Sequence, residues 1–204
     1  KKMQSELVAI LSDLIALPSP YPPGTSVEIC AYTAKRLREA GYKVEIATHK
    51  KGVDNVVARM KGKTKGPVIA FNAHVDTVGV GERSNWKSDP YKALVKGGLV
   101  YGLGAGNCKG SMAVQIWIAE EIARRGGPAS GELIFTFVAD EENLGPEGME
   151  YLRKSGKVRP DALILGAQTE NNLIVAERGV MWARLTTRGR AAHAGNPAAG
   201  DNAI

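Results

Sequence analysis

The N-terminal part of the chain carries apolar side chains at helical spacing, which predicts two helices. In the first, apolar residues recur every three or four positions over Met3–Ile15, and the pattern ends before Pro18. In the second, Thr25 followed three positions later by Glu28 has the spacing of a capping box, and the apolar stripe stops at Gly41. Each segment is therefore expected to bury one face against a core.

Beyond Gly41 the pattern changes to segments typical of strands. Residues 43–48 and 55–60 alternate like neighbouring strands, whereas Val68–Val78 begins with a continuous apolar run and Glu132–Ala139 is another. Such runs are typical of buried parallel strands covered by helices on both faces. Residues 112–122 are apolar on nearly every side, which predicts a central buried helix. Three further strands are expected at Asp161–Gly166, Leu173–Ala176 and Val180–Thr187.

Composition narrows the class of protein. A chain of 204 residues can bury a core of one domain, or of one domain and part of another. Its apolar runs are shorter than the roughly 20 residues that cross a bilayer, and KKMQSEL begins a helix rather than a signal peptide, so we expect a cytoplasmic protein without a membrane segment. The net charge of +6 is scattered, which favours a solvated surface over nucleic-acid binding. Cys30 and Cys108 lie in different settings, which favours reduced thiols.

His74 and Asp76 follow the first buried run and are the first candidates for chemistry. At spacing i, i+2 they point to the same side of an extended chain, and ligands of open α/β sheets gather beyond the carboxyl ends of strands. A carboxylate that takes the proton of one imidazole nitrogen leaves the other nitrogen for a metal. The alternative is a satisfied buried polar pair. His49, in a lysine-rich turn, is assigned no role.

Asp140, Glu141 and Glu142 follow the second buried run. Adjacent carboxylates repel, so this cluster indicates either a nearby cation or a solvated acidic turn before the next helix. The glycine-rich loop at 101–110 fits neither the dinucleotide fingerprint nor the Walker spacing, which argues against phosphate binding.

Several motifs in this order resemble one family, the co-catalytic metallopeptidases and N-acyl amino acid amidohydrolases. It includes acetylornithine deacetylases, succinyl-diaminopimelate desuccinylases, aminoacylases and related carboxypeptidases. The motifs are HVDTV at 74–78, WKSDP at 86–90, YGLGAGNCKG at 101–110, ADEE at 139–142 and GRAAHAGNPAAGDNAI at 189–204. The resemblance implies a doubly wound, mostly parallel α/β catalytic domain interrupted by a smaller α/β lid that also forms a homodimer. On that map, residues 1–178 are the first part of the catalytic domain and residues 179–204 begin the lid.

The resemblance also implies roles for five residues. His74 would ligate one metal, with Asp76 orienting it, and Glu142 would ligate a second metal. Glu141 would be the general base that deprotonates a metal-bound water, and His193 would bind the substrate by stabilising its oxyanion. The implied reaction is hydrolysis of the amide bond of an N-acyl amino acid or small peptide.

Two positions depart from the family's pattern. Asn107 stands where the family has an aspartate that bridges both metals, and Ala167 stands where it has an acidic ligand. An amide oxygen is a weaker, neutral ligand and alanine is none, so we expect one zinc or weakly bound zinc in place of two, with cobalt or manganese possible. A last histidine ligand would lie beyond residue 204. The chain is then a divergent hydrolase, a non-catalytic ligand-binding or dimerisation relative, or an engineered variant.

Overall fold

The computed structural model describes residues 2–170, 172–176 and 178–204. It contains two compact units, Lys1–Glu170 and Asn171–Ile204. The domain boundary expected between residues 178 and 179 stays a prediction.

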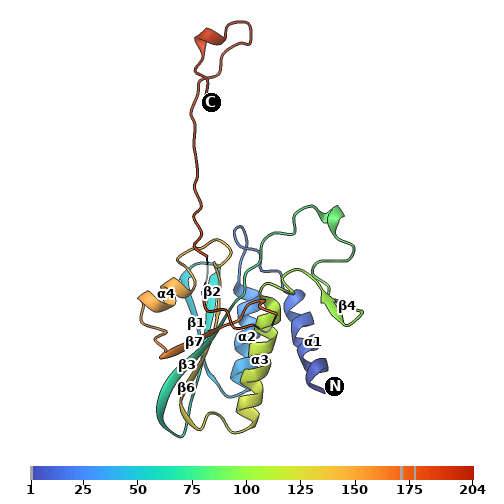
Figure 1. Cartoon of the computed structure of the whole chain (residues 1–204), viewed down its shortest axis with the longest axis vertical. Coiled ribbons are helices and arrows are strands. Elements are labelled where there is room, and N and C mark those ends of the chain that lie inside the picture. The colour runs from blue at the N-terminus through green and yellow to red at the C-terminus, as the bar shows by residue number, and fades with distance from the viewer. Residues whose placement is uncertain (1, 171, 177) are drawn as a thin grey trace. The chain divides into compact units, whose positions relative to one another are not determined.

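The first unit is built on a five-stranded sheet of order β1-β2-β6-β3-β7 (Figure 1). Its strands are β1 (Lys43–Lys50), β2 (Val53–Lys61), β3 (Thr64–His74), β6 (Ser130–Val138) and β7 (Ala162–Leu165). β2 is antiparallel to both of its neighbours, whereas β6, β3 and β7 pair in parallel. Every strand except β2 therefore runs in the same direction, and the predicted, mostly parallel sheet is confirmed.

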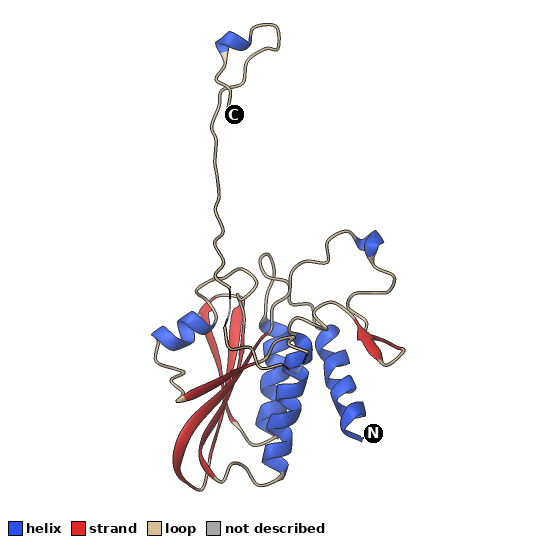
Figure 2. Cartoon of the chain, viewed as in Figure 1, coloured by secondary structure: helices blue, strands red, loops and turns tan. Residues whose placement is uncertain are grey.

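Helices cover both faces of this sheet (Figure 2). The helices are α1 (Lys2–Ile15), α2 (Val27–Glu39), α3 (Lys109–Arg124) and the short α4 (Met149–Lys154). α2 and α3 pack on one face, with α1 against α3, and α4 packs on the other. This is the doubly wound arrangement implied by the sequence, with the predicted central helix as α3.

The two apolar layers follow from alternation along β6. Phe135 and Phe137 join the layer beneath α1, α2 and α3, whereas Ile134 and Val138 join the layer beneath α4. Because both faces are buried, every position of the strand favours an apolar residue, which explains the continuous run.

The start of α2 differs from the prediction. Ser26, not Thr25, is its N-cap, and among the described residues no side chain caps it. The Thr25 hydroxyl instead accepts from the Val27 amide at 3.2 Å and donates to the Gly52 carbonyl at 2.7 Å. The capping-box prediction with Glu28 is therefore wrong, because the hydroxyl ties the helix entry to the turn between β1 and β2.

The long connection from β3 to α3 contains the 3-10 turn η1 (Arg83–Asn85) and a hairpin of β4 (Leu94–Lys96) and β5 (Leu99–Tyr101). Among the described residues, no helix is long and apolar enough to span a membrane.

The second unit forms less regular structure than the sequence predicts. It contains the 3-10 turn η2 (Pro197–Ala199) and an antiparallel bridge between Arg190 and Asp201. In the described parts of this unit, no strand forms at Leu173–Ala176 or Val180–Thr187, so both strand predictions are wrong for this structure. Alternation is a local signal, but a strand also needs a hydrogen-bonded neighbour.

Candidate metal centre

The candidate residues meet at one edge of the sheet. His74 is the last residue of β3 and lies in register with Val138, the last residue of the parallel neighbour β6. Asp140–Glu142 follow β6, and Asn107 lies just before α3. Because the carboxyl ends of parallel strands share an edge, the two halves of the predicted site are brought together.

His74, Glu141 and Glu142 form the core of the site. Each offers a ligand atom, and these atoms all lie within 4.8 Å of one another; it is the single such group in the described residues. The His74 Nε2 atom is 3.5 Å from Glu141 Oε2, and His74 is buried whereas the Glu141 side chain is 52% exposed. One imidazole and two carboxylates are a donor set that suits a divalent cation such as zinc.

Asp76 contacts both His74 and Glu142. His74 Nδ1 donates to the Asp76 backbone carbonyl at 3.0 Å and lies 3.4 Å from Oδ1 of the same residue. The other carboxylate oxygen accepts the Glu142 amide N–H at 3.0 Å. Asp76 therefore fixes the imidazole and leaves Nε2 facing the acidic residues.

The electrostatics favour positive charge between these groups. Burial lowers the pKa of His74, but hydrogen bonds with Asp76 and Cys108 and the charge of Glu141 outweigh it and raise the pKa to about 11. Burial raises the pKa of Glu142; the charge of His74 and the Asn107 hydrogen bond lower it, and the charges of Glu141 and Asp76 raise it further. Both shifts reflect carboxylates crowded at a partly buried place, which a cation would stabilise.

Asn107 lies between the histidine and the second glutamate. Its Oδ1 is 3.2 Å from His74 Nε2, and its Nδ2 donates to Glu142 Oε1 at 2.8 Å. An aspartate here would set a second carboxylate against that of Glu142. The Asn107 amide thus provides a hydrogen-bond partner for both His74 and Glu142. Ala167, which follows β7, has no ligand atom. The described donors therefore fit one divalent cation better than two.

Asp140, the first of the three acids, serves the loop instead of the cluster. It is buried, and its carboxylate accepts from the Glu147 amide N–H at 3.0 Å and from the Asn143 side chain at 3.3 Å. Its φ of 66° lies in the left-handed region, which aspartate tolerates better than most residues. The predicted acidic triplet therefore divides into one structural and two candidate functional residues.

The sequence analysis assigned no role at the site to three buried polar residues. Cys108 contacts His74 and donates its thiol to the Gly166 carbonyl at 3.3 Å. Lys109 donates to the Leu17 carbonyl at 2.8 Å, and burial lowers its pKa to about 8. Asn55 is the third residue of β2, and an asparagine in a predicted strand was the available signal.

His193 belongs to the second unit. Its Nδ1 accepts from the Gly195 amide at 3.1 Å, and its carbonyl accepts from the Asn196 amide at 2.8 Å. The expected contact between His193 and the substrate stays a prediction.

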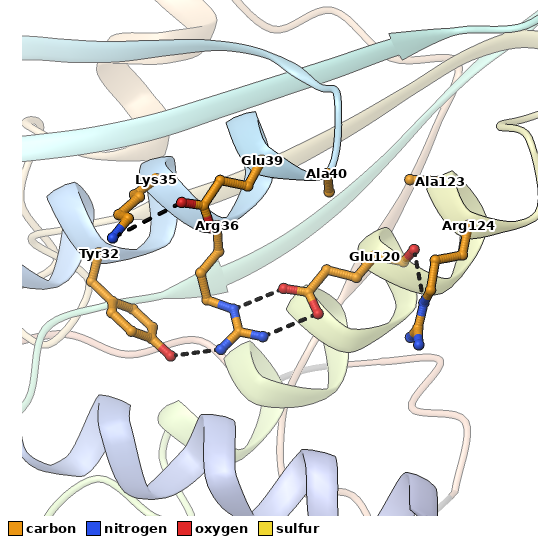
Figure 3. A pocket seen from close by; sticks show the side chains of 8 residues that line it. All are labelled: Tyr32, Lys35, Arg36, Glu39, Ala40, Glu120, Ala123 and Arg124. Carbon is orange, nitrogen blue, oxygen red and sulfur yellow. Dashed lines mark hydrogen bonds and ion pairs between the residues drawn. The ribbon is translucent and has the colours of Figure 1, made fainter.

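A groove of about 720 Å³ lies between α2 and α3 (Figure 3). Arg36 spans it, with bonds of 2.7 and 3.1 Å to the Glu120 carboxylate and of 2.9 Å to the Tyr32 hydroxyl. Lys35 and Glu39 pair at its rim at 3.9 Å. These charges are engaged with one another, so the groove is a helix interface held by ion pairs.

Comparison with known proteins places this arrangement in a family. The pattern of Peptidase family M20/M25/M40 matches residues 70–193, the segment that carries His74, Asn107, Glu141 and Glu142. The chain belongs to this family. The family resemblance seen in the sequence is thereby confirmed.

Individual relatives agree with this assignment. A succinyl-diaminopimelate desuccinylase of Xanthobacter autotrophicus is 32% identical over 209 residues, covering 97% of this chain and 54% of the relative. The chain therefore spans about half the length of this curated relative.

Two solved structures show the same fold. An M20 family metallo-carboxypeptidase of Sulfolobus solfataricus matches with a TM-score of 0.69 and 21% identity, over 79% of this chain and 37% of that one. The YXEP protein of Bacillus subtilis, described as a dinuclear metal-binding peptidase, matches with a TM-score of 0.60 and 22% identity, over 80% of this chain and 43% of that one.

Proposed function

We propose that this M20 family chain belongs to a metal-dependent hydrolase that cleaves the amide bond of an N-acyl amino acid or small peptide. The observation that carries the proposal is the cluster of His74, Glu141 and Glu142, whose ligand atoms lie within 4.8 Å at the carboxyl edge of the sheet. The names of the desuccinylase and carboxypeptidase relatives support this class of substrate.

The cation is zinc in this proposal, with cobalt or manganese as substitutes, and one ion binds with His74 and Glu142 as its ligands. When bound, such an ion polarises an amide carbonyl and lowers the pKa of a water molecule. His74 presents Nε2 because Asp76 engages Nδ1. Asn107 keeps its amide oxygen next to the same nitrogen and can serve as a weak ligand.

Glu141 is the general base. Its carboxylate is exposed enough to meet a water molecule, yet it lies 3.5 Å from His74 Nε2. It takes a proton from the attacking water and returns it to the leaving amine nitrogen, so one side chain serves both halves of the reaction. His193 stabilises the developing negative charge on the carbonyl oxygen, and the lid that begins at residue 179 forms a homodimer; both are part of the proposal.

A non-catalytic ligand-binding or dimerisation role is the second candidate, and Asn107 favours it. The amide bonds both His74 and Glu142, at 3.2 and 2.8 Å, and so completes the cleft without a cation.

Amine release from a panel of N-acyl amino acids, with and without zinc, distinguishes the two candidates. We expect zinc-dependent turnover that falls about 10²- to 10⁴-fold in Glu141→Ala and in the same-shaped Glu141→Gln, the usual contribution of a general base. Glu150→Gln is the matched control, because Glu150 is an exposed acid on α4 that pairs with Lys154. Equal rates in the wild type and both Glu141 variants would show that the base is wrongly assigned. If no substrate is turned over with zinc, the non-catalytic role replaces the proposal.

A further inference from the structure

Asn55 joins the two ends of the loop that carries the acidic residues. Its Oδ1 accepts the Ala139 amide N–H at 3.0 Å, and its Nδ2 donates to the Glu147 carbonyl at 2.9 Å. Nδ2 also donates to the Ala47 carbonyl of the adjacent strand β1 at 3.1 Å. The side chain is fully buried, so these bonds form away from water.

The loop between these two ends contains Glu141 and Glu142. β2 pairs with β6, which places Asn55 beside the point where the loop leaves the sheet. Further bonds hold the loop, among them those in which Asp140 accepts the Glu147 amide N–H and Asp76 accepts the Glu142 amide N–H, each at 3.0 Å. One side chain of β2 therefore holds both ends of the loop to the sheet, and the acidic residues lie on the segment between them.

The three bonds require a carboxamide. Asn55 needs an acceptor for the Ala139 N–H and donors for two carbonyls, and a short side chain with both is asparagine. An aspartate would keep the acceptor and present a repelling oxygen to the carbonyls. An alanine would leave one N–H and two C=O groups without this partner, at a cost larger than that of the bond itself.

We propose that Asn55 is a positioning residue for the metal centre, which acts by holding the loop so that Glu141 and Glu142 face His74. The inference rests on the proposed function, in which those glutamates serve as base and ligand. The proposal gives a role at the metal centre to a residue of β2, a strand that carries none of the candidate ligands.

Zinc affinity tests the effect on the centre. In Asn55→Ala we expect zinc to bind at least about tenfold more weakly, the lower end of what the loss of a residue that orients metal ligands costs. The spectrum of bound cobalt should change as well, because it reports ligand geometry. Tyr42→Phe is the control, since it removes one buried bond, from the Tyr42 hydroxyl to the Ala119 carbonyl at 3.0 Å, away from the loop. This control should lose thermal stability but keep zinc affinity within about twofold.

Amide hydrogen exchange tests the clamp without metal. In Asn55→Ala the Ala139 amide loses its acceptor and should exchange at least about tenfold faster than in the wild type, the factor that matches one lost hydrogen bond. The amides of Glu142 and Glu147 should also exchange faster, because the loop that carries them is no longer held to β2. Asn55→Asp keeps the shape of the side chain and its acceptor oxygen, so it replaces the alanine variant in this test if that variant fails to fold. In Asn55→Asp, amide exchange should increase more at Glu147 than at Ala139.

Unchanged exchange and unchanged zinc affinity in the Asn55 variants would overturn the inference. Equal weakening of zinc binding in Tyr42→Phe would also overturn it, because the effect would then follow from stability alone. If the wild type binds no cation, the proposed function fails, and the exchange rates at Glu142 and Glu147 still decide whether Asn55 holds the loop.

Discussion

Replacing Asn107 by aspartate should make the stability of the cleft depend on a cation. In the wild type, Nδ2 of Asn107 donates to Glu142 Oε1 at 2.8 Å. The variant removes this charge-assisted hydrogen bond, worth about 1.5–3 kcal/mol, and sets two carboxylates against each other. At a separation of about 4 Å and an effective dielectric constant of about 20, that repulsion reaches about 4 kcal/mol.

Proton uptake limits this repulsion, because burial already raises the pKa of Glu142. The His74 imidazole, whose raised pKa keeps it protonated, also attracts the new carboxylate and offsets part of the repulsion. We therefore expect Asn107→Asp to lower the metal-free free energy of unfolding by about 2–3 kcal/mol, which corresponds to a midpoint roughly 5–10 °C lower for a protein of this size. Zinc should reverse the loss, because an anionic oxygen then faces a dication; zinc at 100 times its dissociation constant adds about 2.7 kcal/mol.

Scanning calorimetry with chelator and with excess zinc measures both effects. Asn143→Asp is the matched control: the Asn143 Nδ2 donates to Asp140 Oδ1 at 3.3 Å, so the same substitution in the loop between β6 and α4 removes a comparable bond outside the cluster. The control should lose stability without regaining it in zinc. The reasoning is refuted if Asn107→Asp unfolds at the wild-type temperature in chelator, or if zinc shifts both variants equally.

Two further predictions concern stability outside the metal centre. Burial and the charge of Asp54 raise the pKa of the Cys30 thiol above its ordinary value of 9.0. The unfolded Cys30 thiol then holds fewer protons than the folded one above about pH 9, so this residue lowers stability there by up to about 1.4 kcal/mol per pH unit. Urea unfolding at pH 7.5–10 should show the wild type losing this stability relative to Cys30→Ser, because the other groups titrate in both proteins. Arg36→Met removes the two hydrogen bonds to the Glu120 carboxylate and should lower the free energy of unfolding by about 2 kcal/mol in the same assay. Zinc affinity should stay unchanged. A loss of zinc binding would show that the interface between α2 and α3 affects the metal centre.

The fold and the location of the site could be predicted because both depend on strong local signals. The C-terminal halves of β3 and β6 are buried on both faces, so their sequences are mostly apolar, and His74 and Glu141 lie at or just beyond the ends of these strands. Once both runs are taken as parallel strands, the side chains at their carboxyl ends must share an edge.

The remaining features depend on contacts that no local pattern specifies. The sequence identifies Asn107 as a departure from the family, but its bonds to both His74 and Glu142 follow from the path of the loop before α3. Asn55 looks like a poor strand residue until β2 is placed beside β6. The apolar alternation of Val180–Thr187 predicts a strand, yet the described chain gives it no neighbour to pair with.

Zinc content and hydrolysis of the double variant Asn107→Asp, Ala167→Glu, measured on the same dialysed samples as the wild type, test the central claim most directly. The account predicts that the wild type holds one zinc through His74 and Glu142 and that the two added carboxylates bring about one more zinc per chain, with faster release of amine from N-acyl amino acids. Each single variant should gain less zinc and less activity than the double variant. Ala167→Glu alone lacks the carboxylate that would bridge two metals, and Asn107→Asp alone leaves the first metal site without one of its ligands. If zinc content and rate both stay flat in the double variant, the cleft does not serve metal-dependent hydrolysis and the non-catalytic role is correct.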